Sequence, residues 1–195
     1  MNSQLIILTF AWALYGLLHS LFATDSFKLI IKQLLGTGFK YYRLYYSLFA
    51  TLSLVALLWY HVQIYSPVIW HATIIQKIVA VVMAAVGLAV MVVCARVYFM
   101  EITGLDVFTK KRVIHQLVET GLHKYVRHPL YTGTLLFMWA FFVYSPSLKN
   151  LAGCAVTTLY ILIGILLEEK KLIAAFGNKY KNYAAKTPRL IPRIK

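Results

Sequence analysis

Long apolar stretches separated by short basic segments are the feature that most constrains this chain. A helix that crosses a bilayer needs about 20 predominantly apolar residues. The stretches lie at about residues 5–23, 44–65, 74–98, 130–144 and 151–167. The 195 residues are 61% hydrophobic and 13% charged, which is more apolar and less charged than soluble domains are. The sequence therefore predicts an all-α, polytopic membrane helix bundle with about five transmembrane helices, and a single domain over residues 1–195.

The last two stretches are short, and a six-residue segment, Ser145 to Asn150, joins them. This segment contains Pro146 between two serines, which is typical of a turn. So short a connection forces two helices to be antiparallel neighbours. We therefore expect the chain to end in a helical hairpin followed by a tail over residues 168–195.

The basic residues indicate an orientation in the membrane. Of the 20 Lys and Arg residues, 18 fall in segments 24–43, 96–129 and 168–195. Five spans place these three segments on one side, and only Lys77 and Lys149 on the other. Because basic residues concentrate in cytoplasmic loops, we expect the N-terminus outside and the C-terminus in the cytoplasm. The net charge of +14 is then explained by basic residues on the cytoplasmic side of the membrane, and no nucleic-acid partner is expected.

Two simpler features complete this picture. Cys94 and Cys154 both lie inside apolar stretches, so we interpret them as packing residues and expect no metal site. The first apolar stretch could alternatively be a cleaved signal peptide. The segment before it contains no Lys or Arg, which such peptides normally carry, so we expect this stretch to be retained as a helix.

Polar residues that can perform chemistry gather before the fourth stretch and after the fifth. Pro129 favours the first turn of a helix, which places His128 at the helix entrance and Tyr131 on the same face. The free amides of such an entrance can bind a carboxylate. Glu168 and Glu169 end the fifth stretch at the same membrane level, and their carboxylates can accept from an ammonium group or ribose hydroxyls. Together these groups fit a zwitterionic ligand that carries a sugar.

A structural interpretation of the same residues is also open. Lys124 and Arg127 are typical of cytoplasmic anchors at the end of a span. Glu168 and Glu169 can pair with Lys171 or with neighbouring lysines at the membrane surface. Taken singly, each residue fits this interpretation, and it is their combination that favours a binding site.

The combination resembles a known family. The loop contains His115, Leu117-Val118 and Gly121, and then Arg127-His128-Pro129, Tyr131 and Gly133; the tail contains Glu168-Glu169 with Leu172, Phe176-Gly177, Tyr180 and Tyr183. This pattern is similar to that of the isoprenylcysteine carboxyl methyltransferase superfamily and covers about the last 80 residues. Near the N-terminus, Leu17 to Ala23 is similar to the first helix of the nurim-like branch, which includes methanethiol S-methyltransferases. The resemblance implies a five-helix core, an S-adenosylmethionine pocket on the cytoplasmic side and a methyl acceptor that enters from the bilayer.

The resemblance also implies residue roles. The residues expected to line the cofactor pocket are His115, Leu117, Val118, Gly121, His128, Pro129, Tyr131 and Glu168. Arg127 and Glu169 are expected at the reaction centre, where Arg127 would orient a carboxylate acceptor. For a thiol acceptor, which reacts as the thiolate, the candidate bases are Glu169, His19 and His123. His123 stands where the family has tyrosine, so a cofactor contact at this position is open.

Two other functions remain as alternatives. Membrane sterol reductases that use NADPH share part of the tail pattern, but they are usually much longer and have more spans. A nurim-like structural membrane protein would keep the fold without turnover, since a fold does not guarantee chemistry. The expected partners are the lipid bilayer and a lipophilic or small-molecule acceptor.

Overall fold

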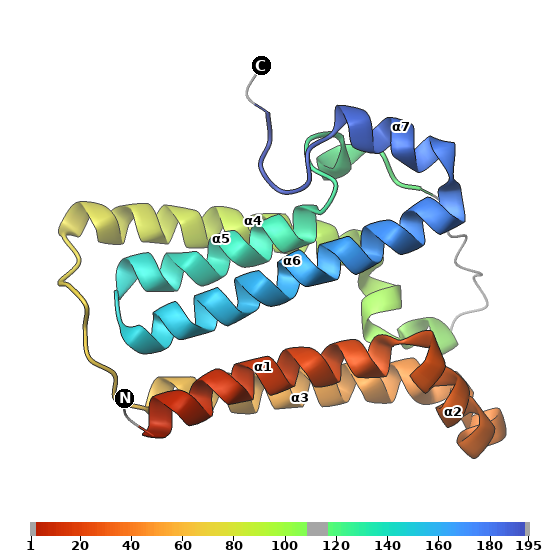
Figure 1. The fold of residues 1–195 in the computed structure, drawn as a ribbon, viewed down its shortest axis with the longest axis horizontal. Coiled ribbons are helices and arrows are strands. Elements are labelled where there is room, and N and C mark those ends of the chain that lie inside the picture. The colour runs from red at the N-terminus through yellow and green to blue at the C-terminus, as the bar shows by residue number, and fades with distance from the viewer. Residues whose placement is uncertain (1–2, 109–116, 194–195) are drawn as a thin grey trace. The chain divides into compact units, whose positions relative to one another are not determined.

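The computed structural model describes residues 3–108 and 117–193 (Figure 1). The chain divides into two compact units, one of Met1–Pro67 with Tyr98–Arg112 and one of Val68–Val97 with Val113–Lys195. All long elements of the described residues are helices, and the only β-type pairing among them is an isolated bridge between Val68 and Ser147. The prediction of an all-α, polytopic membrane protein is confirmed, whereas the expectation of a single domain stays a prediction.

In the first unit, helices α1 (Ser3–Ala23) and α3 (Tyr42–Gln63) run side by side (Figure 1). The two helices are joined through α2 (Asp25–Leu35) and a 3-10 helix, η1 (Gly36–Tyr41). The Trp12 indole donates to His61 Nδ1 at 3.2 Å, and the Tyr42 hydroxyl donates to the Phe22 carbonyl at 2.7 Å. The first bond joins the middle of α1 to the end of α3, and the second joins the end of α1 to the start of α3.

The second unit contains most of α4 (Ile74–Thr103), together with α5 (Pro129–Tyr144), α6 (Leu148–Phe176) and α7 (Asn178–Lys186) (Figure 1). Helices α5 and α6 form the predicted hairpin. The turn is tighter than expected because Ser147 caps α6, its hydroxyl accepting from the Asn150 amide at 3.4 Å. Between the two helices, the Trp139 indole donates to the Thr158 hydroxyl at 3.1 Å.

The helix lengths agree with most of the predicted spans. Four segments of the described chain are long and apolar enough to cross a membrane: α1, Asp25–Gln63, Ile74–Met100 and α6. The fifth, α5, has 16 residues and a length of about 24 Å, so it is shorter than a typical bilayer core of about 30 Å. The helix α6 does not end with the apolar run at Leu167, as expected, but continues to Phe176. Glu168 and Glu169 are therefore held on a regular helix.

The contact between α4 and α5 depends on two glycines. A Cβ atom on Gly87 would lie 2.8 Å from the Gly133 carbonyl oxygen and 2.8 Å from the Phe137 amide nitrogen. A Cβ atom on Gly133 would lie 2.9 Å from the Gly87 carbonyl oxygen. Small residues of this kind let helix backbones approach closely in membranes.

Alanine at either glycine is therefore expected to destabilise the protein by about 1–3 kcal/mol, because backbone atoms cannot move aside cheaply. Thermal unfolding of Gly87→Ala and Gly133→Ala in detergent measures the effect. The matched control is Gly164→Ala on α6, since a Cβ there meets nothing within 4 Å. Equal melting temperatures for all three variants would contradict the close crossing.

Candidate functional site

The entrance of α5 is built as the sequence predicts. Pro129 is the first residue of the helix, and His128 is its N-cap. His128 is 5% exposed, and its ring stacks on that of Tyr131 with centroids 5.7 Å apart. The Pro129 ring is buried, and Tyr131 is half-buried. A buried imidazole thus lies directly at the amide-rich end of the helix.

The segment after α7 is bonded to this helix entrance. The backbone amide of Arg127 donates to the Pro188 carbonyl at 2.8 Å, and that of His128 donates to the Arg189 carbonyl at 3.1 Å. One helical turn further, the Thr132 hydroxyl donates to the Leu190 carbonyl at 2.8 Å. Three successive carbonyl groups of the tail therefore accept hydrogen bonds from Arg127, His128 and Thr132, at and just before the start of α5, and these bonds fix the path of the tail.

The Arg127 side chain joins α6, α7 and the tail. Its Nε and Nη2 atoms donate to Glu169 Oε1 at 2.8 and 2.6 Å. Its Nη1 atom donates to the carbonyls of Ala184, at 2.8 Å, and of Thr187. Four of the five N–H donors of this guanidinium group are thus used within the protein. The ion pair is buried, since the two side chains are about one-tenth exposed.

The Glu169 carboxylate has further partners. Its second oxygen accepts from Arg189, whose Nε and Nη2 atoms lie 3.1 and 2.9 Å away. His128 Nε2 lies 3.3 Å from the oxygen that Arg127 also contacts. Two guanidinium groups on one carboxylate favour its ionised form. We name the residues Arg127, His128, Glu169 and Arg189 the arginine–glutamate cluster.

Glu168 has a different environment, although it is the next residue on α6. Its side chain is 44% exposed, and its carboxylate lies 3.7 Å from His128 Nδ1. This distance allows an ion pair when the imidazole is protonated but exceeds a direct hydrogen bond. Glu168 therefore presents carboxylate oxygens outside the arginine–glutamate cluster, on the face of α6 next to the α5 entrance.

Two tyrosines of α7 pack beneath the cluster, and both are buried. The Tyr183 hydroxyl donates to the His123 carbonyl at 2.6 Å, which connects α7 to the loop before α5. Burial, and then the negative charge of Glu169, raise the pKa of Tyr180 to about 12. Its hydroxyl therefore stays protonated at physiological pH.

The loop before α5 holds the other predicted cofactor residues. Leu117 and Val118 are half-buried, and Gly121 begins a 3-10 helix, η3 (Gly121–Lys124), with a φ of +62° that favours glycine. Burial lowers the pKa of His123, and the nearby His128 lowers it further, so His123 is neutral at pH 7. His115 lies outside the described residues.

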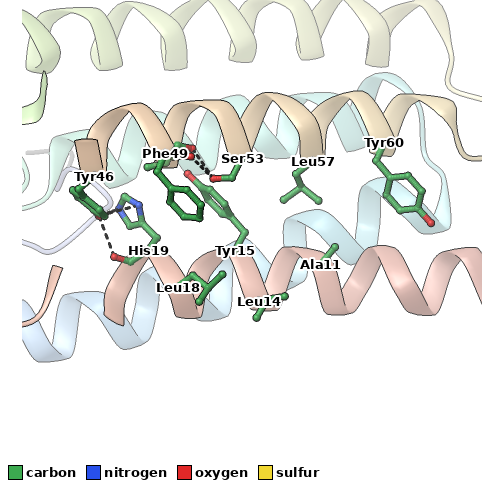
Figure 2. Close-up of a pocket in the computed structure, with 11 residues that line it drawn as sticks. Ala11, Leu14, Tyr15, Leu18, His19, Tyr46, Phe49, Ser53, Leu57 and Tyr60 are labelled. Carbon is green, nitrogen blue, oxygen red and sulfur yellow. Dashed lines mark hydrogen bonds between the residues drawn. The ribbon is translucent and has the colours of Figure 1, made fainter. Parts of the chain in front are cut away.

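His19 belongs to the first unit. It lines a cavity of about 250 Å³ between α1 and α3, together with apolar side chains and three tyrosines (Figure 2). The Tyr46 hydroxyl lies 3.0 Å from His19 Nδ1, and the Tyr15 ring stacks on the imidazole. The polar end of an otherwise apolar cavity is thus formed by His19 and Tyr46.

Sequence reasoning gave no role to Arg189 or to the carbonyl groups around it. Arg189 follows Pro188 in the basic tail. A single basic residue in a lysine-rich tail carries no signal of its partner, and eight basic residues follow Glu169. The fold alone selects Arg189 as the second partner of Glu169.

Comparisons with known proteins identify the family of this chain. The family model described as phospholipid methyltransferase matches residues 75–179. Methanethiol S-methyltransferase 1 of Bradyrhizobium diazoefficiens is 34% identical over 190 residues, which cover 92% of this chain and 64% of that protein. Methanethiol S-methyltransferase of Crocosphaera subtropica is 31% identical over 192 residues, which cover 93% of this chain and 72% of that protein. Protein-S-isoprenylcysteine O-methyltransferase of Schizosaccharomyces pombe is 34% identical over 96 residues, which cover 45% of this chain and 38% of that protein.

The chain spans about two-thirds of the length of the first two relatives. No solved structure is significantly similar to it. The predicted resemblance to the isoprenylcysteine carboxyl methyltransferase superfamily is confirmed, and the relatives named here are all methyltransferases. The chain is a multi-pass membrane protein that belongs to the phospholipid methyltransferase family.

Proposed function

We propose that this protein is an S-adenosylmethionine-dependent methyltransferase that methylates a small thiol at the membrane. The observation that carries the proposal is the junction of the α5 entrance with the part of α6 that contains Glu168 and Glu169. It joins the two sequence blocks that resemble the methyltransferase superfamily, through bonds of 2.6–3.3 Å. The relatives that match over more than nine-tenths of this chain are named methanethiol S-methyltransferases.

The groups at this junction fit the methyl donor. S-adenosylmethionine supplies an electrophilic methyl group on a sulfonium, and it carries a carboxylate, an ammonium group and ribose hydroxyls. Glu168 is the exposed carboxylate, suited to the ammonium group or the hydroxyls. The α5 entrance, with buried His128 and Pro129, is suited to the carboxylate. The residues present thus offer a partner for the ammonium group or the ribose hydroxyls and another for the carboxylate.

Arg127 and Glu169 fit a positioning role in this proposal. Most donors of Arg127 are engaged by Glu169 and by two carbonyl groups, so little of the guanidinium group is available for an acceptor. Glu169, paired with two arginines, is a poor base. The pair holds α6, α7 and the tail in place around His128.

A thiol acceptor needs to lose its proton, because the thiolate is the nucleophile. The new bond joins the methyl carbon to the acceptor sulfur, the sulfonium bond breaks, and the thiol proton goes to a base. A neutral imidazole can accept that proton. His123 is neutral at pH 7, and His19 lines an apolar cavity with room for a small organic group, so both stay candidates.

Direct assay of methyl transfer tests this function. Purified protein is incubated with methyl-labelled S-adenosylmethionine and methanethiol, and the volatile thioether is collected. We expect labelled dimethyl sulfide in repeated turnovers. A prenylated cysteine is offered in parallel. Labelled methyl ester from the prenylated cysteine, with no thioether, would assign the protein to carboxylate methylation. Absence of both products would contradict methyltransferase activity on these acceptors.

We propose further that the chain forms one functional domain, with its N-terminus outside and its C-terminus in the cytoplasm. The support is the placement of 18 of the 20 basic residues in segments that five spans put on one side. A C-terminal green fluorescent protein fusion is expected to fluoresce, and a C-terminal alkaline phosphatase fusion to be inactive. The reverse result would overturn the orientation.

A further inference from the structure

The helix α2 has two chemically different faces. Phe27, Ile30, Ile31 and Leu34 follow the three- and four-residue spacing that places side chains on one helix face. Lys28 and Lys32 lie on the other side of the helix, four residues apart, and Lys28 Nζ makes an exposed ion pair with the Asp25 carboxylate at 3.4 Å. A short helix with an apolar face and lysines on its polar face is typical of segments that lie in a membrane interface.

Local contacts hold α2 firmly against α1. The Thr24 hydroxyl accepts from the Phe27 amide at 3.3 Å and donates to the Leu21 carbonyl at 2.7 Å. The Phe27 ring packs on Phe22 with centroids 4.9 Å apart. At the other end, Gly36 takes a φ of +53° and its amide donates to the Lys32 carbonyl, which closes the helix. The helix is therefore set at a defined angle to α1.

The position of α2 in the chain places it at one membrane surface. It follows α1 after the single residue Thr24, and η1 leads from it directly into α3. The Tyr42 hydroxyl bonds to the Phe22 carbonyl, so the end of α1 and the start of α3 lie together. With 11 residues, α2 is about 16 Å long and cannot cross a bilayer. A connection of this length between neighbouring helix ends stays close to the surface of the bilayer.

The apolar face of α2 is covered only in part, since Phe27 and Ile31 are half-buried and the two other apolar residues are not. Leu34 is 74% exposed and Ile30 is 55% exposed, and no residue of α2 is buried. The segment from α2 to the start of α3 carries four basic residues and one acidic residue, a net charge of +3; the basic residues are Lys28, Lys32, Lys40 and Arg43. An exposed apolar face beside clustered positive charge is complementary to an anionic lipid surface.

We propose that α2 lies in the bilayer interface, with Ile30 and Leu34 in the acyl-chain boundary and Lys28 and Lys32 bound to the phosphates of anionic phospholipids. The occupant is the surface of the membrane that α1 and α3 cross, because that surface adjoins both ends of the helix. Lysine side chains are long enough to lie along the helix and reach the headgroups. The proposal does not depend on the enzymatic activity.

Spin labels test the placement in the full-length protein reconstituted in lipid nanodiscs. Leu34→Cys and Lys32→Cys are labelled with a nitroxide, and unlabelled protein controls for the buried Cys94 and Cys154. We expect the label at 34 to collide with oxygen, which dissolves in lipid, and the label at 32 to collide with a water-soluble nickel complex. A label at 34 that is shielded from both reagents, as under a covering protein surface, would overturn the proposal. Preference of both labels for the nickel complex would overturn it too.

A second measurement tests the choice of lipid. A bimane fluorophore on Leu34→Cys is quenched by nitroxide-labelled phosphatidylglycerol or by nitroxide-labelled phosphatidylcholine. We expect stronger quenching by the anionic lipid, with the preference falling about fivefold for each lysine removed in Lys28→Gln and Lys32→Gln. Lys181→Gln, on α7, is the matched control and is expected to leave the preference unchanged. Equal quenching by both lipids, or an undiminished preference in the double variant, would contradict lysine-mediated lipid binding.

Discussion

Replacement of Arg127 by alanine is expected to lower the free energy of unfolding by about 3–5 kcal/mol and to abolish methyl transfer. The side chain makes two hydrogen bonds to Glu169 and two to carbonyl groups at the end of α7. Its removal leaves a buried carboxylate without its main partner, and Arg189, with a half-exposed side chain, compensates only in part. The end of α7 and the start of the tail then lose the side-chain bonds to the Ala184 and Thr187 carbonyls, while the backbone bonds from Arg127 and His128 to the tail remain.

Thermal unfolding in detergent and methyl transfer are measured on the same preparations. Arg127→Lys keeps the charge but lacks the planar fork that contacts Glu169 twice, so its loss of stability should be smaller and its activity still low. Lys179→Ala is the matched control, because it removes an exposed ion pair, 3.9 Å from Glu119, and such pairs contribute about 0–1 kcal/mol. Wild-type stability in Arg127→Ala would show that the cluster does not hold the tail.

Replacement of Glu168 by glutamine is expected to weaken binding of S-adenosylhomocysteine by about 10- to 100-fold and to leave the fold intact. Its carboxylate is 44% exposed and lies outside the arginine–glutamate cluster, so no buried charge is left behind. Glutamine keeps the size of the side chain but loses its negative charge, and with it the charge-assisted bond to the ligand.

Isothermal titration of the purified variant with S-adenosylhomocysteine measures this effect. Glu119→Gln is the control, since Glu119 is an exposed carboxylate that lies 3.9 Å from Lys179 and has no role in the proposed pocket. Its affinity should equal that of the wild type. An unchanged affinity in Glu168→Gln would remove this residue from the cofactor site.

The sequence predicted the transmembrane helices because long apolar runs have few other solutions. The two short helices α2 and α7 were not predicted, for a common reason. Both are short helices in basic segments, where positively charged residues had been explained by topology alone. The helix α7 is stabilised by tertiary packing of Tyr180 and Tyr183, which local propensity does not reveal.

The sequence predicted which residues belong to the candidate site, but not which side chains contact one another. Adjacent glutamates on one helix look equivalent in sequence, yet one is paired with two arginines and the other is exposed. The difference follows from the 100° rotation between successive helix positions, which turns Glu169 towards Arg127 and the tail. The path of the tail depends on backbone bonds from Arg127 and His128, and such bonds leave no pattern in side-chain identity.

The central claim is that the junction of α5, α6 and the tail binds S-adenosylmethionine. The most direct measurement is the melting temperature of the full-length protein in detergent with S-adenosylhomocysteine or with NADPH. At 100 times its dissociation constant, a ligand of the folded state adds about 2.7 kcal/mol of stability. The account predicts a rise in melting temperature with S-adenosylhomocysteine and none with NADPH. A rise with NADPH alone would indicate a reductase, no rise with either would indicate a structural membrane protein, and both results would contradict the account.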